Sequence, residues 1–390
     1  MRLPLCLLLL VAIASGRAAE TPLPEVIRAS LTAAARQYEW MLAHLPADPA
    51  KPMPRTFEHG KLVTVATRDW TSGFFPGSLW YLFEATGDTK WRAAAEKFTA
   101  QLEPEQHNTR THDVGFILYC SYGNGLRLTG NADYKPVLLN GAKSLTTRFN
   151  PTIGSLKSWD WSKVWEFPVI VDNMMNLEML LWAGREQPGS PFREVAIRHA
   201  DTTLAHHFRD DGSSFHVVDY SAADGRVKSR VTHQGIADAS AWARGQAWGL
   251  YGFTVMYRET RDERYLAQAR KIAAFIMNHP RLPADKVPYW DFDDPKIPNA
   301  PRDSSAAAII CSALLELRTY VPADEAVRYA AFAEAQLRSL ASPAYLAETG
   351  TNGGFILKHA TGNHPKNSEV DTPLNYGDYY FLEALLRARK

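Results

Sequence analysis

Cysteine and net charge are both scarce in this sequence. Only three of the 390 residues are Cys, and Cys6 lies in the first apolar run. The other two, Cys120 and Cys311, are too few for a disulfide framework, so we predict buried free thiols. Lys and Arg (43) nearly balance Asp and Glu (42), so no basic field favours nucleic acid as a partner.

The signature motifs of several enzyme classes are also absent. The sequence has no Walker loop, no Gly-x-Ser-x-Gly elbow and no dinucleotide fingerprint. Neither His206-His207 nor the scattered Asp residues show the spacing of metal ligands. We therefore expect no metal and no other cofactor. No Gly/Ser-rich linker divides the chain, so we expect one catalytic domain over residues 20–390.

The N-terminus is typical of a secretory signal peptide. Arg2 precedes an apolar run over residues 3–14, and small residues follow it up to residue 19. The run is too short to span a bilayer. We expect residues 1–19 to be removed and the mature protein to be periplasmic or secreted, with no membrane attachment. The sequence leaves its oligomeric state open.

A pair of helices recurs along the rest of the chain. In each pair an almost wholly apolar helix is followed by a polar turn and an amphipathic helix. The predicted pairs are 77–87 with 91–102, 118–130 with 134–149, 177–184 with 192–208, 250–261 with 265–276, and 308–320 with 324–340. The first helix (24–45) and the last (378–389) bring the number of helices to twelve.

Wholly apolar helices are buried on all sides, whereas amphipathic helices face water on one side. Alternation of the two kinds predicts an inner ring of helices inside an outer ring, which is an all-α (α/α)6 barrel of six hairpins. The segment 213–232 alternates like a β-hairpin and is predicted as a small insertion that carries His216.

In such a barrel the inner helices all start at the same mouth, and polar or aromatic side chains precede each of them. Asp113 and Asp172 stand where N-caps belong, directly before apolar runs. Two carboxylates at one mouth suit acid/base chemistry, but each is also compatible with a plain helix cap. The other side chains expected there are Asp69, Trp70, His112, Asn173, Trp242, Arg244, Gln246, Arg302, Asp303, Tyr376 and Asp378. Polar and aromatic side chains at all six helix starts around one opening favour a binding pocket there.

Several of these passages together resemble the unsaturated glucuronyl hydrolases of glycoside hydrolase family 88. They are Asp69-Trp-Thr-Ser-Gly-Phe-Phe-Pro-Gly77, Thr111-His-Asp-Val-Gly115, Asp172-Asn-Met-Met-Asn176, Ser240-Ala-Trp-Ala-Arg-Gly-Gln-Ala-Trp248, Arg302-Asp-Ser-Ser-Ala-Ala307 and Tyr376-Gly-Asp-Tyr-Tyr380. They cover nearly the whole mature chain. The family has the barrel inferred above, and its members remove the 4,5-unsaturated uronic acid that polysaccharide lyases leave at a non-reducing end.

The resemblance implies a role for individual residues. Asp172 matches the general acid/base, and Asp113 matches the second essential carboxylate. The residues that match a role in holding the unsaturated sugar are His216, Gln234, Trp242, Arg244, Trp248, Trp70, Trp159 and Tyr376, with Trp161 as a rival to Trp159. The implied reaction is hydration of the C4=C5 double bond, with Arg suited to the substrate carboxylate. A general acid needs a raised pKa, and we expect burial to outweigh the helix N-terminus at Asp172.

Two other functions are compatible with parts of this pattern. One is an unsaturated rhamnogalacturonyl hydrolase of family 105, which shares the barrel, although His216 and the Trp242–Trp248 passage favour family 88. The other is a non-catalytic carbohydrate-binding barrel, which would not require both Asp residues. The parent polysaccharide and its sulfation stay open. Lys366, in a polar loop before the last helix, is expected to hold an anionic group of the substrate.

Overall fold

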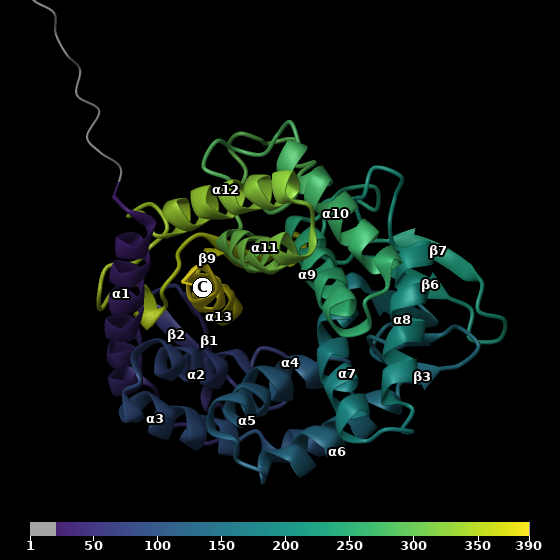
Figure 1. Cartoon of the computed structure of the whole chain (residues 1–390), viewed down its shortest axis with the longest axis horizontal. Coiled ribbons are helices and arrows are strands. Elements are labelled where there is room, and N and C mark those ends of the chain that lie inside the picture. Colours follow the sequence, from purple (N-terminus) through teal and green to yellow (C-terminus); the bar gives the residue numbers. More distant parts are fainter. Residues whose placement is uncertain (1–20, 390) are drawn as a thin grey trace, which may run out of the picture.

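The computed structural model describes residues 21–389, so the predicted signal peptide lies outside the described residues. Over this range the helices form two concentric rings (Figure 1). The inner helices are α2 (Phe74–Thr86), α4 (Val114–Leu118) with α5 (Asn124–Thr129), α7 (Leu177–Glu186), α9 (Ala243–Thr260), α11 (Ser304–Leu317) and α13 (Asn375–Ala388). The outer helices are α1 (Leu23–His44), α3 (Thr89–Ala100), α6 (Tyr134–Thr146), α8 (Phe192–His206), α10 (Glu263–Asn278) and α12 (Ala323–Leu340). The predicted (α/α)6 barrel is confirmed.

The chain closes into a ring because each inner helix packs on the next. Contacts run from α2 through α5, α4, α7, α9 and α11 to α13, and α13 returns to α2. The inner helices are buried nearly all round, as in α11, where each residue from Ser304 to Leu315 is buried. Outer helices bury one stripe only, such as Tyr265, Ala269, Ile272 and Ile276 of α10, at helical spacing. The hydropathy contrast between successive helices therefore fixes which ring each one joins.

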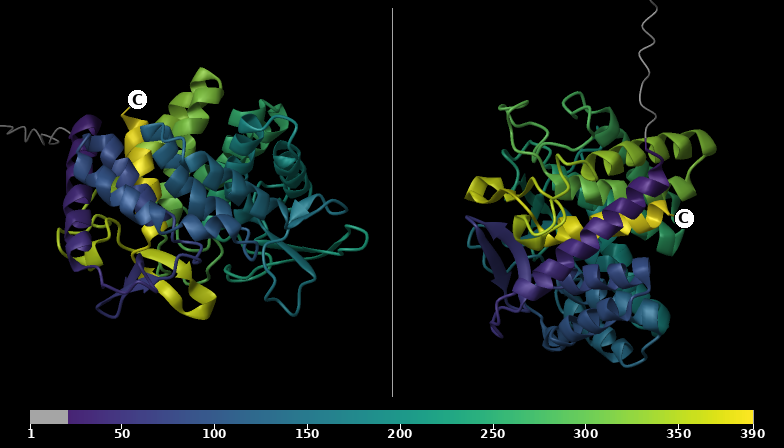
Figure 2. Two further views of the ribbon diagram at one scale, coloured as in Figure 1. Left: turned by 90° about the horizontal axis from the view of Figure 1, so that it is seen from below. Right: turned by 90° about the vertical axis from the view of Figure 1, so that its left-hand side faces the viewer.

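All the strand pairs lie at one end of the barrel (Figure 2). They are β1 (Met53–Glu58) with β2 (Lys61–Val65), β3 (Phe149–Asn150) with β4 (Ser155–Leu156), and β8 (Ala360–Asn363) with β9 (Ser368–Thr372). The predicted hairpin is β6 (Val217–Tyr220) with β7 (Val227–Val231), and β5 (Phe167–Ile170) joins it as a third strand. These segments precede inner helices or cross between them, so they build the walls of one mouth.

The local structure differs from the predictions at three places. Asp172 does not cap a helix: it is the second residue of a 3₁₀ helix, Val171–Asn176, and α7 begins only at Leu177. Asp113 occupies the N-cap position of α4, yet its side chain bonds no N–H of that helix. The helix predicted over 118–130 is interrupted by a π-helical turn, Tyr119–Gly123, where the residue spacing widens. Both carboxylates are thereby free for other partners.

Cys120 and Cys311 are buried free thiols, as predicted. Within residues 21–389 no helix is long and apolar enough to cross a membrane. In the same range no group of three or more His, Cys, Asp or Glu side chains is arranged to hold a metal ion.

Candidate active site

A cavity of about 360 Å³ lies at the mouth where the strands gather. Eight of the predicted site residues line it: Trp70, Asp113, Trp159, Asp172, Gln234, Arg244, Lys366 and Tyr376. They come from separate segments between residues 70 and 376, so only closure of the ring brings them together. The convergence predicted from the helix starts is therefore real for the starts of α2, α4, α7, α9 and α13.

Asp172 lies at the bottom of this cavity and is 8% exposed. Its pKa is raised to about 7, mainly by burial; the charge of Arg244 opposes this shift and the charge of Asp113 adds to it. The direction of the shift is the expected one, upward, with burial as its largest cause. A carboxyl with a pKa near neutrality is suited to donate and take back a proton.

Asp113 faces the same cavity, and burial raises its pKa as well. Its Oδ2 accepts a hydrogen bond from Thr111 Oγ1 at 3.0 Å, and its Oδ1 lies 3.1 Å from Nε2 of His112. His112 donates from Nδ1 to the carbonyl of Ser158 at 3.0 Å, which fixes its ring. Burial lowers the pKa of His112, so the ring favours its neutral form.

His216 presents one ring nitrogen to Asp172. Its Nδ1 accepts hydrogen bonds from the backbone N–H groups of His233 and Gln234, both at 3.1 Å, so the proton of the neutral ring lies on Nε2. Nε2 lies 3.7 Å from Asp172 Oδ2. Both of these atoms are buried and have no hydrogen-bond partner among the described residues. An unsatisfied buried polar atom calls for an explanation, and here both atoms belong to residues at the cavity or directly behind its wall, where a ligand could bond them.

Arg244 is fully buried and already bound within the protein. It pairs with Asp303 at 2.7 Å and donates to the carbonyls of Thr361 and Gly362. Its guanidinium also lies over the rings of Trp242 and Tyr376. A guanidinium has five N–H donors, and these bonds use three. Nε–H and one Nη2–H have no partner among the described residues, so Arg244 keeps donors for a substrate carboxylate.

His216, Trp242 and Trp248 stand behind the wall of the cavity. Trp242 lies between Arg244 and His216, with ring centroids 4.6 Å apart in the Trp242–His216 pair. Trp248 is fully buried and packs on Phe116 and Tyr380. These residues hold the polar groups of the site in place.

Three side chains expected at the mouth are turned elsewhere. Asp378 is buried in the barrel wall and accepts the backbone N–H groups of Ile356 and Leu357, both at 2.9 Å. Gln246 bonds Ser214, and Arg302 pairs with Asp285. Their placement depends on partners far away in the sequence, which helix-start patterns do not reveal.

The cavity also contains residues that the sequence analysis missed. Arg55 bridges Glu369 (2.5 Å) and Asp69 (2.9 Å), so it ties the β8–β9 hairpin to the start of α2. His233 lies against Trp159, with ring centroids 5.1 Å apart. Glu369 is buried although it belongs to the mostly polar strand β9. No local pattern marks these residues, because their partners are up to about three hundred residues away.

A network of amides supports both carboxylates. Asn173 accepts a hydrogen bond from Ser158 Oγ at 2.8 Å and donates to the carbonyl of Leu156 at 2.9 Å. Asn176 accepts from the backbone N–H of Phe116 at 2.8 Å, across from the Asp172 segment to the first turn of α4. A side chain added at Gly115 would meet Asn176 Cα at 2.7 Å. The two segments that carry Asp113 and Asp172 are thus held in direct contact.

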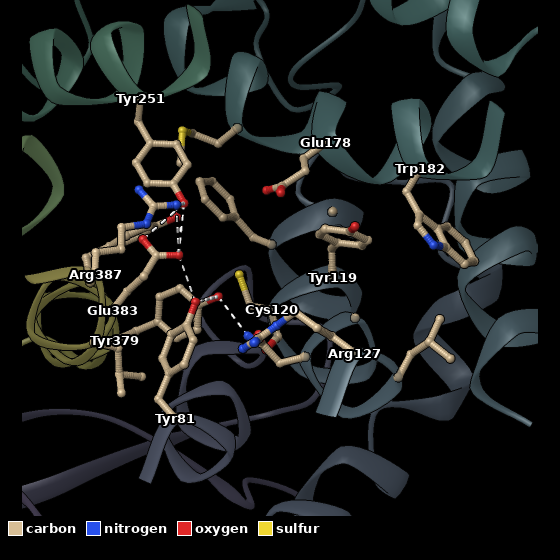
Figure 3. A pocket seen from close by; sticks show the side chains of 18 of the residues that line it. Tyr81, Tyr119, Cys120, Arg127, Glu178, Trp182, Tyr251, Tyr379, Glu383 and Arg387 are labelled. Carbon is tan, nitrogen blue, oxygen red and sulfur yellow. Dashed lines mark hydrogen bonds and ion pairs between the residues drawn. The ribbon is translucent and has the colours of Figure 1, made fainter. Parts of the chain in front are cut away.

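A second cavity, of about 520 Å³, opens among the middle and last turns of the inner helices (Figure 3). Glu383 lies in it and accepts hydrogen bonds from Tyr81 at 2.8 Å and Tyr251 at 3.0 Å. Around it charges pair with one another: Arg127 with Glu84, Arg258 with Glu178 and Glu316, and Arg387 with Glu316 and Glu383. Because these charges compensate one another, this cavity lacks a carboxyl like Asp172, whose pKa near 7 suits it to acid/base chemistry.

The mouth of this (α/α)6 barrel holds a buried carboxyl with a pKa near neutrality, a second carboxyl, and Trp and Tyr side chains in the wall. Such a site is suited to acid/base chemistry on a sugar. The comparisons agree. The Glycosyl Hydrolase Family 88 model matches residues 50–386. The chain is 52% identical over 325 residues (83% of this chain, 80% of the relative) to an unsaturated glucuronyl hydrolase of Formosa agariphila.

Solved structures give the same result. The crystal structure of an unsaturated glucuronyl hydrolase specific for heparin superposes with a TM-score of 0.89 at 49% identity, covering 93% of this chain and 97% of that one. That of the unsaturated glucuronyl hydrolase of Bacillus sp. GL1 superposes with a TM-score of 0.86 at 29% identity, covering 95% and 97%. The chain belongs to glycoside hydrolase family 88. It is therefore a glycosidase.

The raised pKa of Asp172 predicts a pH-dependent cost in stability. In the unfolded chain an Asp titrates near pH 4, about three units lower than in the fold. Its folded pKa is the higher one, so folding is favoured while the group is protonated and is penalised progressively as pH rises toward 7. The variant Asp172→Asn cannot be charged. Relative to wild type, it should gain roughly 1–3 kcal/mol of unfolding free energy between about pH 5 and pH 8.

Urea unfolding at the two pH values measures this change. Asp210→Asn is the matched control, because Asp210 is exposed. Its difference from wild type should stay constant. A pH-independent difference for Asp172→Asn would mean that the folded protein does not raise the pKa of Asp172.

Proposed function

We propose that Asp172 is the general acid/base that hydrates the C4=C5 double bond of an unsaturated uronic acid bound in the strand-side cavity. The observation that carries this proposal is the buried Asp172 carboxyl, with its pKa near 7 beside Asp113. Near neutrality such a group is present in both protonation states, and hydration needs both.

The reaction then follows from the substrate. Protonated Asp172 gives its proton to C4, and positive charge develops at C5 and on the ring oxygen. The Asp172 carboxylate next takes a proton from water, which adds at C5. The hemiketal formed at C5 opens by breaking its bond to the ring oxygen, which leaves a ketone at C5. The hemiacetal left at C1 then collapses to an aldehyde and releases the saccharide. Because bond cleavage follows hydration, the carboxyl separation that sorts retaining from inverting glycosidases does not apply.

The other residues bind and orient in this scheme. The two unused N–H donors of Arg244 hold the substrate carboxylate, and Nε2–H of His216 orients Asp172. Trp70 and Tyr376, with ring centroids 5.0 Å apart, supply an apolar wall for the sugar ring. Asp113 keeps the pKa of Asp172 high, and Gln234, which lines the cavity, offers an amide to the sugar hydroxyls.

We further propose export to the periplasm or the medium. The support is the charged and apolar pattern of residues 1–19 described above.

Asp172→Asn should lose turnover by roughly a hundredfold or more, because Asn keeps the shape but cannot shuttle a proton. Loss of ultraviolet absorbance by the conjugated alkene of a lyase-generated disaccharide measures turnover directly. Asp210→Asn, an exposed Asp remote from the cavity lining, serves as the control and should keep its rate. A variant at residue 172 that retained a tenth of the wild-type rate would remove Asp172 from the acid/base role.

We also propose that the substrate carries an anionic group that Lys366 contacts. Lys366 is exposed, lines the cavity, and lies close enough to His233 for its charge to lower the pKa of that ring, although burial is the main cause. The solved relative at 49% identity is specific for heparin, a comparison that supports a sulfated substrate. An exposed contact of this kind is modest and is screened by salt.

Lys366→Ala should therefore lower kcat/KM for a sulfated unsaturated disaccharide by about two- to fivefold at low ionic strength, and less for its unsulfated counterpart. Added salt should shrink the difference. Lys163→Ala is the control, because Lys163 is exposed but does not line the cavity. Equal losses on both disaccharides, or no loss on either, would mean that Lys366 does not contact the sulfate.

A further inference from the structure

Three of the four large apolar side chains that are exposed within residues 21–389 lie on two loops beside the cavity. Trp161 and Val164 belong to the loop 157–166, and Ile236 belongs to the loop 232–241; the fourth, Val327, is on the outer helix α12. Trp161 is 58% exposed and is the only Trp among them. Of the four, only Trp161 lines the cavity, so it is the exposed apolar side chain that a ligand in the cavity can cover.

The exposed Trp161 is held on an ordered loop. Asp160, its neighbour, pairs with the buried guanidinium of Arg148 at 2.8 Å. The turn beyond it is closed by Ser162 Oγ, which accepts the backbone N–H groups of Val164 and Trp165 at 3.2 and 3.0 Å. The indole is therefore presented in a fixed place, and a ligand that covers it does not need to order the loop first.

Aromatic rings form a graded series from the cavity to its rim. Trp159 is half-buried and lies 6.0 Å from His216, measured between ring centroids, so it is close to the residues around Asp172. Trp161 lies 5.1 Å beyond Trp159 and 5.3 Å from His233. Asp172 is buried, Trp159 is half-buried and Trp161 is exposed. This order of depth follows the direction in which an oligosaccharide leaves a pocket that holds its end sugar.

Another part of the cavity lining is polar. It is formed by the hairpin of β8 and β9, which contributes Asn363, Lys366 and Ser368 to the cavity lining. His233 joins the two parts, since it contacts Trp161 and senses the charge of Lys366. A cleft lined by both aromatic rings and donors suits a sugar, whose ring has an apolar face and a hydroxylated edge.

Resting on the proposed function, we infer that Trp161 is a specificity-determining residue that stacks on a sugar beyond the two joined by the scissile bond. The unsaturated end sugar occupies the base of the cavity near Asp172, and the next sugar passes Trp159. The third sugar covers the exposed face of Trp161. The enzyme therefore favours unsaturated tetrasaccharides over disaccharides with the same end group.

The test compares a disaccharide and a tetrasaccharide produced by one lyase from one polymer. Wild type should show a higher kcat/KM on the tetrasaccharide. Trp161→Ala should lower kcat/KM on the tetrasaccharide about three- to tenfold, because the apolar contact with the third sugar is lost. The fold-loss in kcat/KM on the disaccharide should be at least about threefold smaller. Trp161→Phe should recover part of the loss. Val327→Ala is the control, because Val327 is an exposed apolar residue on the outer helix α12 and does not line the cavity, and it should change turnover of neither substrate.

Equal losses on both lengths would assign Trp161 to the first two sugars, and no loss on either would leave it outside the substrate path; both results overturn the inference. Calorimetry in the Asp172→Asn background separates this test from that of the acid/base. There the tetrasaccharide should bind more tightly than the disaccharide, and Trp161→Ala should remove the difference. Loss of the length effect with turnover still dependent on Asp172 would overturn only the inference, whereas a length effect with turnover independent of Asp172 would overturn only the proposed function.

Discussion

Burial of the Asp172 carboxyl is the constraint on which the rest of the site depends. A carboxyl at the start of a helical segment would ordinarily be charged near neutrality, because the helix N-terminus favours the anion. Here burial disfavours the charged form, the charge of Asp113 acts in the same direction as burial, and the pKa of Asp172 rises to about 7. The burial exists only because the ring of inner helices closes and the strand-side loops cover the mouth.

The neighbouring residues bind and orient the Asp172 segment while they leave the pKa of its carboxyl high. Arg244 is the nearest source of positive charge that lowers the pKa of Asp172, and the fold ties it to Asp303 and two carbonyls. His216 is neutral because its Nδ1 accepts two backbone N–H groups. Asn176 joins the Asp172 segment to the start of α4, which carries Asp113. The site thus holds two carboxyls close together and limits the nearby positive charge, which would lower their pKa values.

The sequence was sufficient to predict the ring and most of the cavity, for a physical reason. Inner and outer helices differ in hydropathy, and a ring of antiparallel hairpins brings alternate helix starts to one mouth. The sequence alone therefore predicts that the site residues of these starts lie together, namely Trp70, Asp113, Asp172, Arg244 and Tyr376. The local geometry at Asp172 could not be predicted, since a 3₁₀ segment of 6 residues is too short for its hydrophobic spacing to be distinguished from that of an α-helix. Arg55 and Glu369 were missed because their pairing joins segments more than three hundred residues apart.

The protonation state of Asp172 can be observed directly by infrared difference spectroscopy between wild type and Asp172→Asn. Wild type should show the carbonyl band of a protonated carboxyl below about pH 6, absent from the variant, and this band should convert to a carboxylate signal with a midpoint near pH 7. Asp113→Asn should move this midpoint downward, because it removes a charge that raises the pKa of Asp172. A carboxylate signal for Asp172 that persisted unchanged down to about pH 5 would contradict the account.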